Sequence, residues 1–207
     1  MSKQSPTSTT SFINVRMQQN RTPTGRRTST PAKKAALYYA FGREAQQQQA
    51  GRQQRGQWLG PDGKVCSHET VMDWVKVEAK THRYTFQAVL STPANELTPT
   101  AFVQAMQAAG QIQNWRLITH DDTQNRHAHV LWFGDKRLDK KQFLAWQAAV
   151  RAELVQQVEA QAGTQQATAE TSWQTSLGLE PQHGLKREQQ DEAKQAESRS
   201  RGVGLGW

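Results

Sequence analysis

The chain has 207 residues, of which 35% are hydrophobic, and it carries a formal net charge of +8. This length leaves room for one domain of ordinary size plus tails. Its one cysteine, Cys66, excludes an intramolecular disulfide and a thiolate-cluster zinc site, and no apolar run approaches the ~18 residues that span a bilayer. We therefore expect a cytoplasmic protein with no membrane insertion and no secretory signal.

The predicted elements rest on two periodicities. Strands are predicted where apolar and polar side chains alternate, and helices where apolar side chains recur every three or four residues. In chain order they are a strand over 11–17, a helix over 31–41, a helix over 67–80, a strand over 83–92, a helix over 98–109, strands over 114–120 and 126–134, and a helix over 139–161. Because the last two strands are joined by a short turn, they must be antiparallel. The pattern predicts an α+β fold, an antiparallel sheet with helices packed on it.

Capping residues support several of these boundaries. Ser67 and Asp139 are N-cap candidates for the second and fourth helices, and Thr98, followed by proline, starts the third. Glycines stop the first and third helices, at Gly42 and Gly110.

The composition divides the chain into three parts. Residues 1–10 are rich in Ser, Thr and Gln, and we expect them to be disordered. Residues 11–162 are predicted to form the α+β domain, with a flexible segment of Gln, Arg and Gly over 44–60. Residues 163–207 are rich in Gln and in charges of both signs, and we expect a weakly structured tail.

Positive charge is concentrated in the first third of the chain. Residues 1–60 hold ten Lys or Arg against one acid, a net of +9, whereas the remainder holds 16 basic and 17 acidic residues. Such an asymmetry indicates a polyanionic partner, most simply nucleic acid, bound through its phosphates. The alternative is a solvated basic tail.

Three of the six histidines, His120, His127 and His129, lie within ten residues. In a strand, residues two apart point to the same face, so His127 and His129 project together. If residues 121–126 form a six-residue connection, His120 lies opposite His127 on that same face. With a five-residue connection and no bulge, it lies on the other face and the cluster does not form.

Three neutral imidazoles with an open fourth position make a catalytic rather than a closed structural metal site. An ion held there can polarise a phosphoryl oxygen. Imidazoles alone suit zinc or another transition metal better than magnesium, so the ligand set does not fix the metal. The alternative is that these are ordinary half-buried histidines.

The stretch His120-Asp-Asp-Thr-Gln-Asn125-Arg-His127-Ala-His129-Val resembles the histidine motif of the relaxases of plasmid mobilisation and conjugation, within the HUH endonuclease superfamily. The order of predicted elements agrees with that family over roughly residues 11–160. The resemblance implies a relaxase-like palm. It also implies site- and strand-specific DNA nicking and strand transfer at an origin of transfer, in which a tyrosine forms a 5′-phosphotyrosyl bond. The resemblance further implies that the three histidines hold a divalent metal, expected to be magnesium or manganese.

The family requires a tyrosine near the N-terminus. The segment around Tyr38 and Tyr39 is similar to the family's tyrosine segment, and the spacing to Arg43 selects Tyr39, with Tyr38 as the runner-up. A phenol with a pKa near 10 is a weak nucleophile unless a metal or neighbouring cations favour its phenolate. Lys33, Lys34 and Arg43 are candidates for that role.

The resemblance also implies supporting roles. Asp122, or Asp121, is expected to orient an imidazole. Trp58 and Trp74 are candidates to stack on single-stranded bases, although Trp74 is more simply a core residue. We expect core positions for Trp74, Trp115, Trp132 and Trp146. The expected phosphate contacts are Arg16, Arg21, Arg26, Arg27, Lys33, Lys34 and Arg43.

Three features depart from the family pattern. The Gln/Arg/Gly run is longer and plainer, no segment resembles the helicase or primase domains of large relaxases, and Gln-Asn-Arg precedes the histidines where the family often has Asn-Pro. A small mobilisation-type relaxase, a compact relaxase of an integrative element and a degenerate relative all fit. The expected partners are single-stranded DNA at a nick site and accessory proteins of a transfer complex. The alternatives are a non-catalytic nucleic-acid-binding module and an HUH replication initiator or transposase.

Overall fold

The computed structural model describes residues 11–42, 53–92, 97–121 and 125–176, with side chains as far as residue 164. Within these ranges the fold is α+β, with a six-stranded antiparallel sheet and four helices, which confirms the predicted class. The elements are β1 (Phe12–Gln19), α1 (Thr30–Phe41), β2 (Trp58–Leu59), β3 (Val65–Cys66), α2 (His68–Thr81), β4 (Tyr84–Ser91), α3 (Pro99–Ala108), β5 (Trp115–His120), β6 (His127–Gly134) and α4 (Lys140–Ser176). The predictions for residues 1–10, for 44–52 and for the end of the tail lie outside the described residues.

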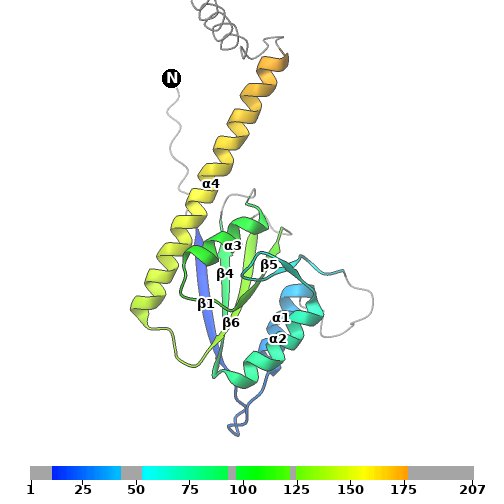
Figure 1. The fold of residues 1–207 in the computed structure, drawn as a ribbon. Helices are drawn as coiled ribbons and strands as arrows, with labels where there is room; N and C mark the ends of the chain where they lie inside the picture. Colours follow the sequence, from blue (N-terminus) through cyan, green and yellow to red (C-terminus); the bar gives the residue numbers. More distant parts are fainter. Residues whose placement is uncertain (1–10, 43–52, 93–96, 122–124, 177–207) are drawn as a thin grey trace, which may run out of the picture. The chain divides into compact units, whose positions relative to one another are not determined.

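The strands of the sheet lie in the order β1-β4-β6-β5-β2-β3, and all neighbours are antiparallel (Figure 1). The hairpin of β5 and β6 therefore lies in the interior of the sheet. The strand β4 pairs with β6 along the whole length of β6, with Ser91 paired to His127 and Tyr84 paired to Gly134.

One face of the sheet is covered by α3 and the N-terminal part of α4. Alternate residues of β4 point to this face, which buries Phe86, Ala88 and Leu90 in one core. Trp146 of α4 is buried in the same core, and its ring centroid lies 5.7 Å from that of Trp132 on β6. The expected core positions of Trp115, Trp132 and Trp146 are thus confirmed.

The other face is covered by α1 and α2. The residues that α1 turns to the sheet are mostly alanines, and Ala32, Ala36 and Ala40 are completely buried. Such small side chains let the helix backbone approach closely, and the core beneath it includes Ile118 of β5 and Leu131 of β6. This close approach brings α1 onto the same face as the histidines.

The predicted helix starts agree with the capping contacts. The side chain of Ser67 accepts a hydrogen bond from the backbone N–H of Thr70, and the side chain of Thr98 accepts one from Ala101. The Asp139 carboxylate accepts a hydrogen bond from the N–H of Lys141 at 2.6 Å. These contacts satisfy N–H groups that would otherwise have no partner within the helix.

Two expectations for the chain need correction. The Gln/Arg/Gly segment contributes β2, which pairs with β5, and the short strand β3 pairs with β2. The last helix does not end near 161, because α4 continues to Ser176. The chain separates into two compact units, Met1–Ala162 and Gly163–Trp207. None of the helices in the described part is long and apolar enough to cross a membrane.

Gly56 fixes how closely the segment before β2 approaches β5. A Cβ at this position would lie 2.2 Å from the carbonyl oxygen of Thr119, the residue before His120. We expect Gly56→Ala to lower the free energy of unfolding by about 1–3 kcal/mol, because the backbone must move apart. Urea denaturation measures this change. Gly163→Ala is the matched control, since nothing lies within 4 Å of its added Cβ and it should be neutral or slightly stabilising; equal effects of both changes would contradict the prediction.

Candidate metal centre and tyrosine pocket

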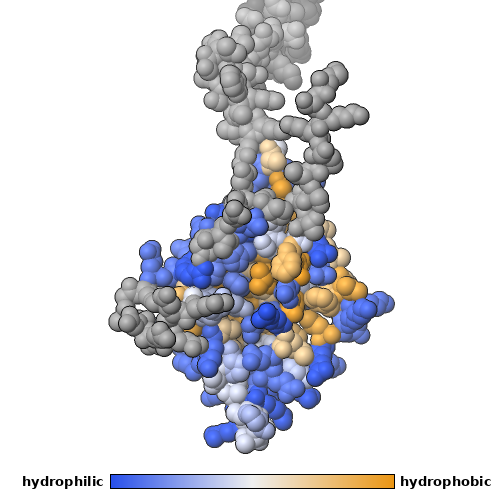
Figure 2. Space-filling view, turned by 180° about the vertical axis from the view of Figure 1, so that it is seen from behind, coloured by the Kyte–Doolittle hydropathy of each residue, from blue (hydrophilic) through white to orange (hydrophobic). Residues whose placement is uncertain are grey.

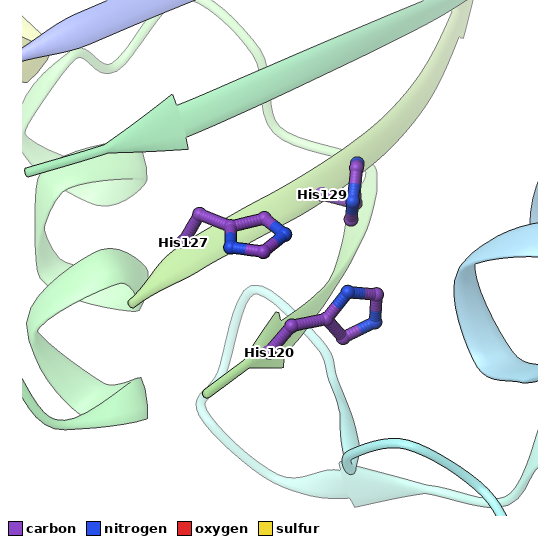
Figure 3. A group of neighbouring side chains, drawn as sticks. All are labelled: His120, His127 and His129. Atoms are coloured by element: carbon purple, nitrogen blue, oxygen red, sulfur yellow. The ribbon is translucent and has the colours of Figure 1, made fainter. Parts of the chain in front are cut away.

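The β5–β6 hairpin brings the three histidines together. The six-residue connection places His120 directly opposite His127 in the antiparallel pair, as the sequence predicts. The three rings point toward one another from the two strands, and their centroids are 4.9–5.2 Å apart (Figure 3). His129, two residues beyond His127 on β6, shares that face of the sheet.

The cluster has the donor set and the dimensions of a metal site. One ring nitrogen from each histidine can be chosen so that all three lie within 4.8 Å of one another. Three nitrogens around one zinc-like ion at about 2.1 Å would lie at most about 4.2 Å apart, so small side-chain movements suffice. These three histidines can therefore hold a divalent metal ion.

Backbone carbonyls orient two of the imidazoles. The Nε2 of His120, whose side chain is only 2% exposed, lies 2.7 Å from the carbonyl oxygen of Tyr39. The Nδ1 of His127 lies 3.2 Å from the carbonyl oxygen of Asn125. A nitrogen that donates to a carbonyl carries the proton, so the other nitrogen of each ring is a lone-pair donor suited to a metal.

Of the two carboxylates suggested for this orienting role, only Asp121 belongs to the described residues. Asp122 lies outside the described residues. The Asp121 carboxylate lies 3.7 Å from a guanidinium nitrogen of Arg126 and is largely exposed. The orienting groups among the described residues are main-chain oxygens, which no sequence motif reveals.

Tyr39 lies directly over the cluster. Its ring stacks on that of His129, with centroids 4.1 Å apart and planes inclined by 15°. Its hydroxyl donates a hydrogen bond to the side-chain oxygen of Gln87 at 3.1 Å, and only 5% of the residue is exposed. Tyr38 is 42% exposed, and its ring centroid is 5.9 Å from that of Tyr39. The chosen tyrosine thus faces the histidines, and the runner-up lies at the rim.

A pocket of about 300 Å³ opens beside the stacked pair. It is lined by Asn14 and Arg16 of β1, Ala35, Tyr38 and Tyr39 of α1, Gln87 and Val89 of β4, and His129 of β6. The pocket therefore combines both phenols, one imidazole and one guanidinium.

Burial raises the pKa of the Tyr39 phenol well above its ordinary value, and the charge of Arg16 opposes this shift. Lys33 and Lys34 were expected to supply that positive charge, but they lie more than a turn earlier on α1. Arg43, the third candidate, lies outside the described residues. Arg16 was expected only to contact phosphate, and pairing β1 with β4 brings it beside the phenol.

The raised pKa of Tyr39 makes stability depend on pH in the alkaline range. The folded protein keeps the phenolic proton, whereas the unfolded chain loses it as the pH rises past the ordinary value of 10.0, so stability falls there. We expect Tyr39→Phe to reduce this loss by about 1 kcal/mol at pH 11, measured by urea denaturation from pH 8 to 11. Tyr38→Phe is the control, and the prediction fails if both variants follow the wild-type pH profile.

The other predicted phosphate-binding residues lie away from the histidines. Arg21 and Arg27 pair across a hairpin that follows β1, and Arg26 is exposed beside them. That end of β1 is in register with the Gly134 end of β6, far from His127. Lys34 is exposed and Lys33 partly exposed near the start of α1.

The tryptophans suggested for base stacking are engaged in the fold. Trp58 is 0% exposed, because β2 pairs with β5 beneath α1 and α2, so its suggested role is wrong. Trp74 is partly buried against the core. The guanidinium carbon of Arg116 lies 4.8 Å from the centroid of the Trp74 ring. The indole N–H of Trp74 donates a hydrogen bond to the side-chain oxygen of Asn114 at 3.1 Å.

A second, smaller pocket of about 130 Å³ adjoins His120. It is lined by Arg55, Gly56, Pro99, Thr119, His120, Asp121 and Arg126. The pocket brings the guanidiniums of Arg55 and Arg126 beside His120, together with the Asp121 carboxylate, which lies 3.7 Å from Arg126. No sequence motif connects Arg55 with the histidines.

The fold and site define an α+β protein with a three-histidine cluster beneath a stacked tyrosine. Comparison with family models, curated proteins and solved structures finds no match to this chain. Its function is therefore inferred from the chemistry of the site.

Proposed function

We propose that the protein is a metal-dependent DNA nicking and strand-transfer enzyme of the relaxase type. The observation that carries this proposal is the stacking of Tyr39 on His129, at 4.1 Å, within a cluster of three histidines. A phenol beside a three-imidazole metal site has the two parts that transesterification of a phosphodiester needs, a nucleophile and a means of neutralising charge.

In the proposed reaction, the Tyr39 oxygen attacks a DNA phosphorus and forms the phosphotyrosyl bond. The phenolic proton of Tyr39 passes to solvent, the bond between phosphorus and the 3′-oxygen breaks, and that oxygen takes a proton from solvent to become the free 3′-hydroxyl. A metal ion held by His120, His127 and His129 would neutralise charge on the phosphoryl oxygens. Arg16, in the same pocket, offers positive charge to the phosphate and to the forming phenolate.

Gln87 has a positioning role in this proposal. It accepts the hydrogen bond of the Tyr39 hydroxyl at 3.1 Å, and its own amide lies 3.4 Å from the side-chain oxygen of Gln18. These contacts restrict the rotation of the phenol before the substrate arrives. The proposed substrate is single-stranded DNA at a nick site, and the proposed metal is magnesium or manganese. The HUH-like palm and accessory partners of a transfer complex belong to the same proposal.

The test is incubation of the purified protein with manganese or magnesium and single-stranded oligonucleotides that tile the DNA around its own gene. The expected product is a covalent protein–DNA adduct that survives denaturing electrophoresis and is lost with a chelator. Binding should also weaken steeply as salt is raised, because several phosphate contacts are expected. Absence of an adduct on every oligonucleotide would contradict the proposal.

The burial of Tyr39 favours one alternative, a non-catalytic nucleic-acid-binding module. Its phenol is bonded to Gln87, and desolvation raises its pKa, both of which oppose nucleophilic attack. In that case the protein binds single-stranded DNA without forming an adduct, and substituting the histidines leaves binding unchanged. An HUH replication initiator or transposase would use the same chemistry on another substrate.

A further inference from the structure

The strand register places Phe12 of β1 in the same row across the sheet as His120 and His127. His120 pairs with His127, His127 pairs with Ser91, and Ser91 pairs with Phe12. Directly paired residues in neighbouring strands point to the same face. Phe12 therefore projects from the face that carries the histidines, two strands from His127, at roughly 10 Å.

Phe12 lies on a part of this face that the helices leave open. The helices α1 and α2 cover the residues of β5 and β6 beyond the histidines, such as Ile118 and Leu131. On β1, in contrast, the residues that share the face of Phe12 are exposed, among them Asn14 and Arg16. Phe12 itself is 56% exposed, although it is a large aromatic residue.

Apolar and hydrophilic side chains adjoin on the surface of the protein (Figure 2). On β1, Phe12 lies in the row of the histidines, and Arg16 is exposed four residues further along the same face of the strand. An exposed aromatic ring and a guanidinium on one face of a strand, roughly 13 Å apart, can hold a single nucleic-acid strand through base stacking and phosphate contact. A buried core position for Phe12 is excluded, because its neighbour Ile13 occupies the core on the opposite face.

We propose that Phe12 is a stacking platform for a base of a single DNA strand that crosses the open face of β1 and β4 toward the histidines. This inference rests on the proposed function, since it assumes that a phosphate of that strand reaches the cluster. Single-stranded DNA is favoured as the occupant because Arg16 shares the exposed face of β1 with Phe12 and lines the pocket beside His129, where its positive charge can contact a phosphate of the strand. A duplex keeps its bases paired and stacked, so it cannot present a base face to Phe12.

The experiment compares two probes by fluorescence anisotropy with the full-length protein. One is oligothymidylate of about 20 nucleotides, and the other is an abasic strand of the same length, with equal phosphates but no bases. The wild-type protein should prefer oligothymidylate by about tenfold. Phe12→Ala and Phe12→Leu should reduce this preference severalfold, and Phe12→Trp should restore it. Arg16→Gln should weaken binding to both probes alike.

Two controls separate stacking from other effects. Leu144→Ala removes another exposed apolar side chain, on α4, and should leave the preference unchanged. Circular dichroism melting checks that each variant is folded. If Phe12→Ala keeps the full wild-type preference while the wild-type protein forms its adduct, the inference is overturned and the proposed function stands. If the wild-type protein forms no adduct and binds neither probe, the proposed function itself fails.

Discussion

Tyr39→Phe is expected to abolish the covalent protein–DNA adduct, with a loss of at least about 1,000-fold in the rate of its formation. The substitution removes the attacking oxygen but keeps the ring that stacks on His129. The fold should survive, because the change removes one hydrogen bond, to Gln87, which contributes about 1 kcal/mol. Adduct formation on a reactive oligonucleotide, followed by denaturing electrophoresis, measures the effect.

Tyr38→Phe is the matched control for this prediction. Tyr38 lines the same pocket as Tyr39, but it is the more exposed of the two and does not contact the histidine cluster in the described contacts. Its loss should change the rate only severalfold. If the adduct is instead lost in Tyr38→Phe and kept in Tyr39→Phe, the exposed phenol is the nucleophile and the stacked phenol is a support for His129.

The sequence predicts the parts of the fold whose signals are local. Alternation in 83–92 and 126–134 reflects two faces with different environments, and both segments form strands, β4 and β6. The position of His120 also follows from a local count, since a six-residue turn in an antiparallel pair sets which residues face each other. These predictions need no knowledge of distant residues.

The parts that the sequence does not predict depend on distant neighbours. The strands β2 and β3 have two residues each, which is too short to show a periodicity. The strand β2 forms because its backbone pairs with that of β5, which lies far away in the sequence. The same pairing buries Trp58, which the sequence alone treats as available for base stacking. Arg16 reaches the phenol only because β1 pairs with β4, a strand some seventy residues later in the chain.

His127→Ala is expected to remove most of the stabilisation of the protein by divalent metal. A ligand at a hundred times its Kd stabilises a protein by about 2.7 kcal/mol, which corresponds to a rise in Tm of about 5–10 °C for a chain of this size. Losing one of three imidazole ligands should weaken binding about 100-fold or more, so the rise should shrink to about 1 °C. Thermal denaturation with manganese, magnesium, cobalt and zinc measures it.

His127 is the ligand whose removal tests binding most cleanly. His120 is buried and bonded to the backbone of α1, so its loss would also destabilise the fold, and His129 supports the ring of Tyr39. His127 is partly exposed at the start of β6, and its ring contacts the other two histidines. His68→Ala, a histidine of α2 outside the cluster, is the control and should keep the full metal response. A wild-type protein that no divalent metal stabilises, or a His127→Ala variant that responds fully, would show that the cluster does not bind metal, and the proposed chemistry would lose its basis.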